Sequence, residues 1–514
     1  MPLRPFAPRL SALGWAGIAF LLLLVSLSGD SIDMMEAQTW AYAQQTSFSG
    51  FLDVMHSDTT QVSQMPLGMF STWVWAQGFG TGELAMRSIN LLWAAIALAA
   101  FARLGRQFSI PWLPLLFAIQ PFVWYYMNYA RTPLMQMAGG ALLLAGAAGF
   151  LPRGKKSGLD ATLLCVGGIL LSGAHILGVL PVGAVACWLV LLGIWRKLRL
   201  SATTKALLFL SAAILAALAA YYATTLLRGH GADNYWSVSP SNLLFVAYEF
   251  LGFSGFGPGR QELRAIMKGL ISAQALLAFI PGLLFLVAAY LVAFGAAAKS
   301  WMTREATREH VARGGRRIAR SYEQLPAWLM GVAVPILSAS VLFLLAFALA
   351  QPFWGRELAG AFPFWVLVLG ITIHWARQGI WRRAGRLAIG IILACLMASS
   401  LLIRFAPWHK HDDYRGAATE AIRTAAEGKV VWWVADHSGA IYYGLPIAET
   451  ITGAPGEIQF SMNRSEPGSP DAIIISRPDI FDSLGVATRL IESGSYQKTR
   501  SLQAFDVWEK APAQ

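Results

Sequence analysis

The chain has 514 residues, of which 56% are hydrophobic and only 13% are charged. A soluble protein of this length needs more charge to cover its surface, so the composition excludes a soluble globular enzyme. The formal net charge of +12 would suit a nucleic-acid ligand. However, the Lys and Arg residues cluster in alternate loops between apolar runs, a pattern that indicates membrane topology and not nucleic-acid binding.

Apolar runs of about 18 residues or more predict membrane-spanning helices. The basic clusters lie at 4–9, 103–106, 153–156, 196–205, 299–320 and 377–386. By the positive-inside rule these loops and the N-terminus are cytoplasmic and the C-terminus is outside. The first run lacks a small-residue cleavage site and is expected to be retained. We therefore expect a multi-pass protein of the plasma (inner) membrane with about eleven spans, near 11–29, 84–102, 110–128, 133–151, 159–175, 177–195, 206–224, 269–297, 327–350, 358–376 and 387–405.

Three acidic residues follow the first span at once. The stretch "GDSIDMMEAQTW" places Asp30, Asp33 and Glu36 three residues apart, at the start of a predicted helix over 33–46. Asp30 and Asp33 resemble a helix cap, and acids are also favoured there by the helix dipole. One cap does not use three acids, so catalysis or cation binding stands as the alternative. The same outer loop, 30–83, contains an apolar helix over 66–79 that is too short to span and is expected to lie at the interface.

Beyond residue 407 the composition becomes that of a soluble protein. A helix over 414–427, strand-like runs "KVVWWVA" and "DAIIISR", and a helix in "DIFDSLGVATRLIES" predict a small α/β domain outside the membrane. The predicted architecture is thus mainly α, with a transmembrane helical bundle in 1–406 and an extracytoplasmic α/β domain in 407–514. No Gly-rich phosphate loop supports nucleotide binding. "HKHDD" (409–413) could bind a divalent cation, although a linker with a helix cap is the simpler interpretation.

Several motifs occur in the order found in one family of membrane enzymes. They are "DSIDMMEAQTWAYA", "QMPLGMFSTWVWAQGFGTGELAMRSINLLW", "YYMNYARTPLMQMAGGALLL", "LSGAHILGVLPV", "QPFWGRELAGAFPFWVLVL" and "HDDYRGAATEAIRTAAEGKVVWWVADHSGAIYYG". In order and spacing the chain resembles the GT-C membrane glycosyltransferases. The branch it resembles holds protein O-mannosyltransferases, the aminoarabinose lipid A transferase and rhizobial lipopolysaccharide-core transferases. Two positions depart from the family pattern. Met34 stands where the family has the Glu of its Asp-Glu motif. Gln64-Met65-Pro66 stands where the family has His or Lys followed by Pro-Pro.

The resemblance implies transfer of a sugar from a polyprenyl-phosphate donor to a lipid, glycan or protein acceptor outside the membrane. Such a reaction needs a carboxylate to deprotonate or orient the acceptor hydroxyl and cations to hold the leaving phosphate. Asp33 is the expected base, Asp30 is the second choice and mainly a cap, and Asp58 is a weaker third, with Glu36 nearby. The phosphate is expected to meet Arg131, Arg264, Lys268 and Arg356, all at outer span ends.

Some of these residues have structural alternatives. Arg264 and Lys268 could simply snorkel to the interface. His175, at a turn between two apolar runs, could be a satisfied structural histidine or a substrate contact. A divalent Mg²⁺ or Mn²⁺ near Asp33 is possible but not required, and no metal ligand set is specified. The basic stretch 299–320 is expected to meet anionic membrane lipid.

A transporter or flippase of a lipid-linked or polar substrate is the alternative function. A transporter should carry ionisable residues in the middle of broken, repeated helices. The spans here are nearly free of charge and the acids lie at their outer mouth, which favours the enzyme. A third possibility is a non-catalytic assembly protein whose outer domain binds a partner.

Overall fold

The structure is a computed structural model that describes residues 10–58, 61–151, 158–196, 200–227, 238–258, 279–308, 315–349, 353–378, 381–448, 454–461 and 468–511. The chain divides into two compact units. The first, here called the membrane unit, comprises Met1–Leu27, Met55–Ser71 and Arg87–Ala406. The second, here called the α/β unit, comprises Ser28–Val54, Thr72–Met86 and Pro407–Gln514. Parts of the predicted outer loop thus belong to the same unit as the C-terminal sheet.

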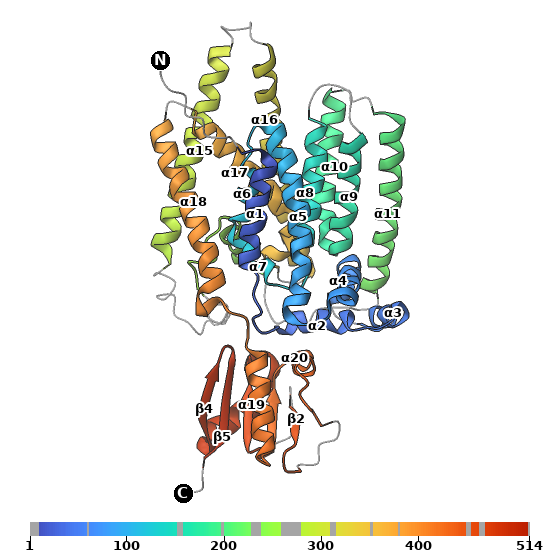
Figure 1. Cartoon of the computed structure of the whole chain (residues 1–514), viewed down its shortest axis with the longest axis vertical. Helices are drawn as coiled ribbons and strands as arrows, with labels where there is room; N and C mark the ends of the chain where they lie inside the picture. Colours follow the sequence, from blue (N-terminus) through green and yellow to red (C-terminus); the bar gives the residue numbers. More distant parts are fainter. Residues whose placement is uncertain are drawn as a thin grey trace. The chain divides into compact units, whose positions relative to one another are not determined.

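Long apolar helices run side by side in the membrane unit (Figure 1). In the described part of the chain, seven segments are long and apolar enough to cross a membrane, and three shorter apolar helices accompany them. This confirms a polytopic helical membrane protein. The helices of these segments are α1 (Ala12–Ser26), α5 (Glu83–Phe108), α8 (Pro133–Gly149), α9 (Gly158–Ala174), α10 (Val179–Arg196), α11 (Ala202–Leu227), α15 (Ile280–Arg308), α16 (Gly315–Leu349), α17 (Phe362–Ala376) and α18 (Arg382–Phe405).

The shorter elements lie between these helices. The predicted apolar helix over 66–79 is confirmed as α4 (Pro66–Phe79), whereas the predicted helix over 33–46 is shorter, as α2 (Met34–Ala43). The others are α3 (Phe48–Ser57), α12 (Pro240–Phe250), and the 3₁₀ turns η1 (Gln61–Gln64), η2 (Ile176–Gly178), η3 (Gly355–Ala361) and η4 (Pro407–His409).

The expected continuous span over 110–128 is wrong. The segment forms two short helices, α6 (Leu113–Ala118) and α7 (Pro121–Met127). Pro121 has no N–H to donate and biases Gln120 toward an extended backbone, which breaks the helix. Side chains donate hydrogen bonds to the carbonyl groups that lose their helical partners at the break. The Trp124 indole donates to Ala118 O at 2.7 Å, and Ser400 Oγ donates to Ile119 O at 2.9 Å. A broken helix is tolerated at membrane depth only when its backbone is satisfied in this way.

Helices α8 and α9 pack backbone against backbone because glycines of each helix face the backbone of the other. A Cβ on Gly146 would lie 2.3 Å from Leu164 N, and a Cβ on Gly167 would lie 2.3 Å from Leu143 N. Small residues allow such close approach between membrane helices, where packing replaces the hydrophobic effect. The two helices therefore depend on glycine at these positions.

This packing predicts different results for two neighbouring glycines. Gly167→Ala should destabilise the protein by about 1–3 kcal/mol, because the atoms it meets are backbone and cannot rotate away. Gly168→Ala is the matched control, since the nearest atoms to its Cβ are Val182 side-chain carbons at 3.8 Å. Thermal unfolding of the full-length protein in detergent compares the two variants. Equal unfolding temperatures would contradict the predicted close packing.

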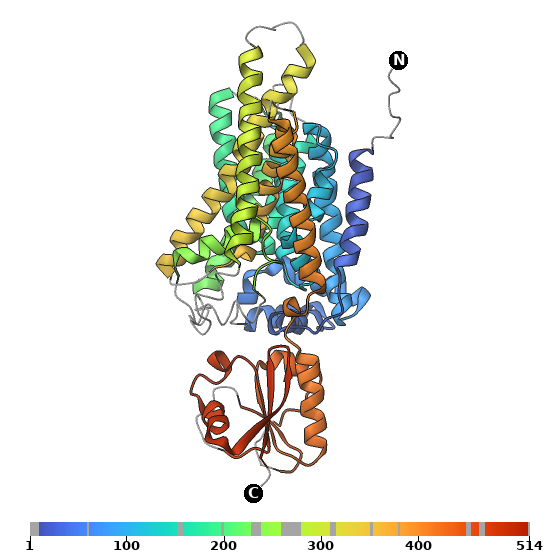
Figure 2. The same ribbon diagram turned by 90° about the vertical axis from the view of Figure 1, so that its left-hand side faces the viewer.

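The α/β unit is built on a five-stranded sheet with strand order β2-β1-β3-β5-β4. Strand β1 is parallel to β2 and β3, whereas β5 is antiparallel to β3 and β4. The predicted strands are confirmed as β1 (Val431–Val434) and β3 (Ala472–Ile475), and the predicted helix over 414–427 as α19 (Tyr414–Ala426). Helix α19 lies along one face of the sheet (Figure 2). The strands that the sequence did not indicate are β2 (Ile458–Phe460), β4 (Tyr496–Leu502) and β5 (Phe505–Lys510).

The predicted last helix is broken as well. The stretch forms α21 (Pro478–Phe481), α22 (Val486–Leu490) and a π-helical turn at Ile491–Ser495, while α20 (His437–Tyr442) follows β1. Gly485 interrupts the helix with φ of 68°, a left-handed conformation that glycine adopts easily. The core of the unit contains Trp432 and Trp433, both nearly inaccessible, and Tyr414 packs edge-on against Phe505.

Candidate active-site residues

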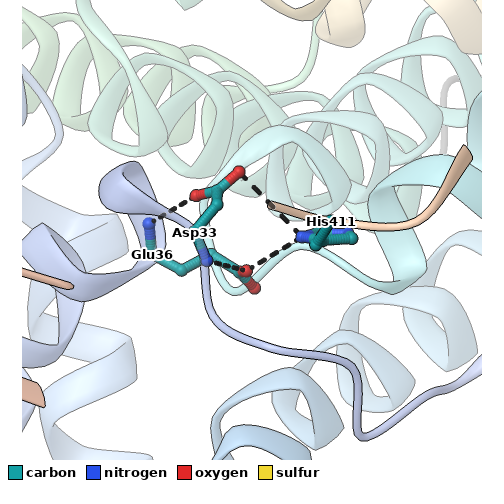
Figure 3. A group of neighbouring side chains, drawn as sticks. All are labelled: Asp33, Glu36 and His411. Carbon is teal, nitrogen blue, oxygen red and sulfur yellow. Dashed lines mark hydrogen bonds and ion pairs between the residues drawn. The ribbon is translucent and has the colours of Figure 1, made fainter. Parts of the chain in front are cut away.

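The N-terminus of α2 is closed by a reciprocal capping box. Asp33 Oδ1 accepts a hydrogen bond from Met35 N at 3.0 Å. It also accepts one from Glu36 N at 3.0 Å, and Glu36 Oε2 accepts one from Asp33 N at 3.2 Å (Figure 3). Both side chains are buried, Asp33 at 7% exposed and Glu36 at 0%. The capping residue is therefore Asp33, as the spacing to Glu36 allows.

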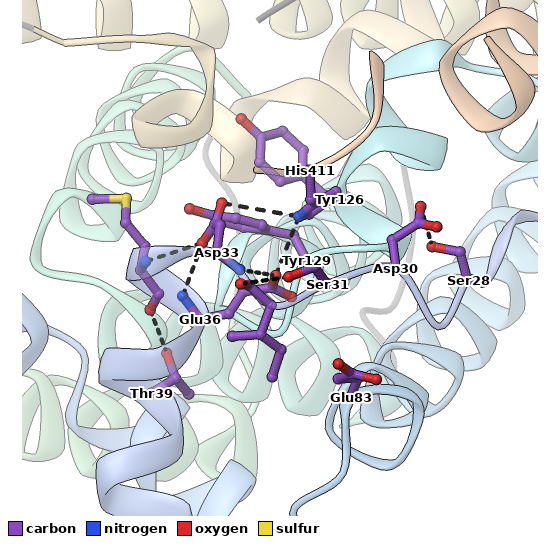
Figure 4. Close-up of polar contacts among 12 residues, drawn as sticks. Ser28, Asp30, Ser31, Asp33, Glu36, Thr39, Glu83, Tyr126, Tyr129 and His411 are labelled. Atoms are coloured by element: carbon purple, nitrogen blue, oxygen red, sulfur yellow. Dashed lines mark hydrogen bonds and ion pairs between the residues drawn. The ribbon is translucent and has the colours of Figure 1, made fainter. Parts of the chain in front are cut away.

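Asp30 does not cap the helix, so its predicted capping role is wrong. It lies three residues before Asp33, and its Oδ2 accepts a hydrogen bond from Ser28 Oγ at 2.8 Å (Figure 4). The physical reason is register: α2 begins at Met34, so only Asp33 has its oxygen next to the first unpaired N–H groups. Asp30 belongs to the extended segment that leads into the helix.

His411 completes a group that sequence reasoning did not assemble. Its Nδ1 lies 3.2 Å from Glu36 Oε2 and 3.9 Å from Asp33 Oδ2, and the residue is 7% exposed (Figure 3). The sequence drew attention to "HKHDD" only as a local cation motif. No sequence pattern links His411 to Asp33 and Glu36, because their contact depends on how the α/β unit folds.

A polar network fixes the segment before α2 to the helices of the same unit. Tyr443 OH donates to Glu83 Oε1 at 2.7 Å and accepts from Ile32 N at 2.8 Å. Arg415 N donates to Ser31 Oγ at 3.1 Å, and its guanidinium pairs with Glu83 at 2.5 Å. Burial, together with the neighbouring Glu83 carboxylate, raises the pKa of Tyr443 to about 12, so this phenol stays a donor at neutral pH. The Asp33 and Glu36 carboxylates are therefore carried by a fixed backbone.

A polar pocket occupies the membrane unit. Two guanidinium groups, one carboxylate and one imidazole line it. Its lining residues are Met65, Tyr129, Arg131, Thr132, Pro133, Gln136, His175, Arg356 and Glu357. They come from the turn between α7 and α8, the first turn of α8, the residue after α9, the residue before α4, and η3. Three residues predicted to contact substrate, Arg131, His175 and Arg356, thus meet in one pocket.

Arg131 and Arg356 are held differently. Arg131 lies in the tight turn before α8, where its N–H donates to Tyr129 O at 2.7 Å, and it is 8% exposed. Arg356 Nε donates to Glu357 Oε1 at 2.6 Å, and Glu357 Oε2 in turn accepts from Trp354 N at 2.8 Å. Two guanidinium groups thus line the pocket, and guanidinium groups suit an anionic ligand.

His175 takes part in the local backbone as well as in the pocket. Its Nδ1 accepts a hydrogen bond from Leu177 N at 3.1 Å, so it caps η2. A ring nitrogen that accepts carries no proton, which leaves the hydrogen on Nε2 and the imidazole neutral. The structural role is thereby confirmed, and the neutral ring adds a donor to the pocket wall without adding charge.

The other predicted contacts lie elsewhere. Asp58 directly follows α3 and is not among the residues that line the pocket. Arg264 and Lys268 lie outside the described residues. Met65 lines the pocket, one residue after Gln64, which stands where the resembled family carries His or Lys, and the arginines that line the pocket are Arg131 and Arg356.

Comparison with known proteins finds few relatives. No family model matches the sequence, and no curated protein sequence matches it. Among solved structures, the chain is similar to ArnT from Cupriavidus metallidurans bound to undecaprenyl phosphate, with a TM-score of 0.41 and 14% identity over 96% of this chain and 97% of that one. The apo structure of the same protein gives a TM-score of 0.40 and 13% identity over the same shares. With TM-scores below 0.5 this likeness assigns no activity to the chain.

Proposed function

We propose that this protein is a GT-C-type glycosyltransferase that moves a sugar from a polyprenyl-phosphate donor to an acceptor in the cell envelope. The observation that carries the proposal is the pocket lined by Arg131, His175 and Arg356. These residues come from three separate segments of the chain. The sequence predicts a phosphate contact for Arg131 and Arg356 and either a substrate contact or a structural role for His175. A pocket with two guanidinium groups and a neutral imidazole donor is suited to a phosphate whose charge increases as the sugar leaves.

Arg131 and Arg356 would hold the phosphate through planar forks that match its oxygens in pairs. His175 Nε2–H would donate a further hydrogen bond to it. Asp33 would supply the carboxylate that orients and deprotonates the acceptor hydroxyl. Its Oδ1 is engaged in the helix cap, so Oδ2 is the oxygen for this role. The acceptor is a lipid, a glycan or a protein, and the donor and membrane lipids are the other partners.

The distribution of buried charge favours an enzyme over a transporter. In the described parts of the spans, the buried charged side chains are Arg87 and Asp160, which lie within the first two turns of α5 and α9. Asp160 is paired with Arg103. A transporter would place such groups near the middle of the membrane, at broken and repeated helices. Both charges instead lie near helix ends, at opposite faces in the proposed topology, so the described spans lack the buried mid-membrane charge expected of a transporter.

A mass comparison of envelope glycolipids and glycans tests the proposal. Cells that lack the protein should lose a species heavier by one sugar residue, and expression of the protein should restore it. The matched control is a variant with Arg131 and Arg356 both replaced by Gln, expressed at the same level in the membrane. Identical glycolipid and glycan profiles with and without the protein would exclude the transferase. Restoration by the double variant would exclude the pocket as the donor site.

The proposed orientation is N-terminus in the cytoplasm and C-terminal domain outside the plasma membrane, as the basic loops indicate. Single cysteines at Ser49 and Ser493, both exposed, should react with an impermeant thiol reagent added from outside. A cysteine at the exposed Ala384 should react only after permeabilisation. The three native cysteines are replaced by Ser beforehand. Outside labelling at 384 but not at 49 would invert the topology.

A further inference from the structure

Two carboxylates and an imidazole from distant parts of the chain converge in the α/β unit. One oxygen each from Asp33 and Glu36 and one ring nitrogen of His411 lie within 4.8 Å of one another. Asp33 and Glu36 belong to the N-terminal end of α2, whereas His411 lies between η4 and α19. In Figure 3 all three polar ends point toward the same small volume. This arrangement has the side-chain chemistry of a metal site.

The spacing of the donor atoms suits a first-row metal ion. Ligand atoms that bind such an ion at about 2.0–2.2 Å lie about 3–3.6 Å apart. His411 Nδ1 is 3.2 Å from Glu36 Oε2, within that range, and 3.9 Å from Asp33 Oδ2, which a small side-chain rotation would correct. The capping hydrogen bonds hold both carboxylates in place from behind, as outer hydrogen bonds do at metal sites.

Buried acidic side chains occur together here. Asp33 is 7% exposed, Glu36 is 0% exposed, and Asp412, next to His411 in the sequence, is 3% exposed. The His411 ring faces both carboxylates. A buried divalent cation would balance both.

We propose that Asp33, Glu36 and His411 bind a divalent transition-metal ion, Zn²⁺ or Mn²⁺, that joins the start of α2 to the segment before α19. An imidazole nitrogen with two carboxylates favours these ions over Mg²⁺ and Ca²⁺, which take oxygen ligands. The metal ion would act as a cross-link between positions that are far apart in sequence. This proposal goes beyond glycosyl transfer, and its binding test needs no transfer activity. The ion would occupy Asp33 Oδ2, the oxygen proposed above as the base, so a bound ion is expected to lower transfer.

Metal titration of the full-length protein in detergent provides the test. Protein stripped with EDTA should take up one Zn²⁺ or Mn²⁺ per chain, measured by elemental mass spectrometry and by the Mn²⁺ paramagnetic-resonance signal. Metal should raise the unfolding temperature, and Mg²⁺ at the same concentration should not. His411→Gln should weaken binding by about a hundred-fold or more. His409→Gln, in the same segment but outside the group, is the matched control and should bind as the native protein does.

Two further measurements keep the proposal falsifiable. Glu36→Gln retains the capping box, because Gln can serve at that position, but removes one charge, so it should fold and bind metal weakly. If His411→Gln does not fold, hydrogen exchange of the native protein with and without metal replaces it, and protection should rise at 33–37 and 411–416. Absence of stoichiometric uptake, unchanged affinity in His411→Gln or Glu36→Gln, equal binding of Mg²⁺, or unchanged protection would overturn the site. His411 and Glu36 would then form an ion pair only.

Discussion

Asp33→Asn is expected to lower sugar transfer by about a hundred-fold or more, the loss typical of a removed general base. Asn caps helices as well as Asp does, so the hydrogen bonds to Met35 N and Glu36 N should persist. The EDTA-treated variant should therefore unfold at the same temperature as the EDTA-treated native protein. Transfer is measured as polyprenyl phosphate released from a radiolabelled polyprenyl-phosphate sugar, with the variant at equal levels in the membrane. A loss of transfer at an unchanged membrane level and unfolding temperature is then due to the lost charge of Asp33 and not to misfolding.

Two control variants distinguish a catalytic role of Asp33 from a role in capping α2. Asp30→Asn should change neither activity nor stability appreciably, because Asp30 contacts Ser28 and not the helix end. Asp33→Ala should lose activity and in addition about 1 kcal/mol of stability, the usual cost of a lost cap. If Asp33→Asn turns over normally, the acid is only a cap and the proposed base is wrong. If Glu36→Gln loses as much activity as Asp33→Asn, the two carboxylates act together through their charge.

Arg131→Lys is expected to reduce transfer about tenfold or more and to raise KM for the donor. Lys keeps the positive charge but loses the planar fork that grips two phosphate oxygens. Arg131→Ala should cost more, about 2–3 kcal/mol of transition-state binding, since a hydrogen bond to a charged group is worth about 1.5–3 kcal/mol. Polyprenyl phosphate added as a competitor should inhibit both variants more weakly than it inhibits the native enzyme.

Arg404 provides the matched control for this experiment. It lies near the end of α18, and its Nη2 donates to Leu27 O at 3.2 Å, but it is not among the residues that line the pocket. Arg404→Lys should therefore leave KM for the donor unchanged. Full activity and unchanged competition in both Arg131 variants would remove Arg131 from the donor site. An equal effect at Arg404 would show that any arginine at a span end matters, independent of the pocket.

The sequence by itself determined the class of the protein and most of its elements. Long apolar runs must form helices in a membrane, because each backbone polar group has to find its partner within the segment. The apolar helix α4, the helix α19 and the buried strands β1 and β3 follow from local composition and periodicity in the same way. The candidate residues Arg131, His175 and Arg356 were also found from sequence, because polar groups at span ends stand out against apolar surroundings.

The tertiary structure determined three features that local sequence patterns do not predict: the helix break at Pro121, the residue that caps α2, and the strands β4 and β5. The sequence around Pro121 does not determine whether the helix breaks there. The break is stable because Trp124 and Ser400 donate hydrogen bonds to the carbonyl groups that lose their helical partners. Which acid caps α2 depended on one residue of register, which the spacing of three acids left open. The strands β4 and β5 contain many exposed side chains, so they lack the apolar run that identified β1 and β3.

The contact of His411 with Asp33 and Glu36 is the clearest case of information that only the fold supplies. Each residue has a complete local explanation, in a linker or in a helix cap, and no periodicity connects them. They meet because the segment before α2 hydrogen-bonds to Tyr443 and Arg415 of the α/β unit, which places the start of α2 beside the residue that precedes α19 by three positions. Long-range contacts of this kind depend on the packing of whole elements, and packing is a property of the folded chain and not of any stretch of its sequence.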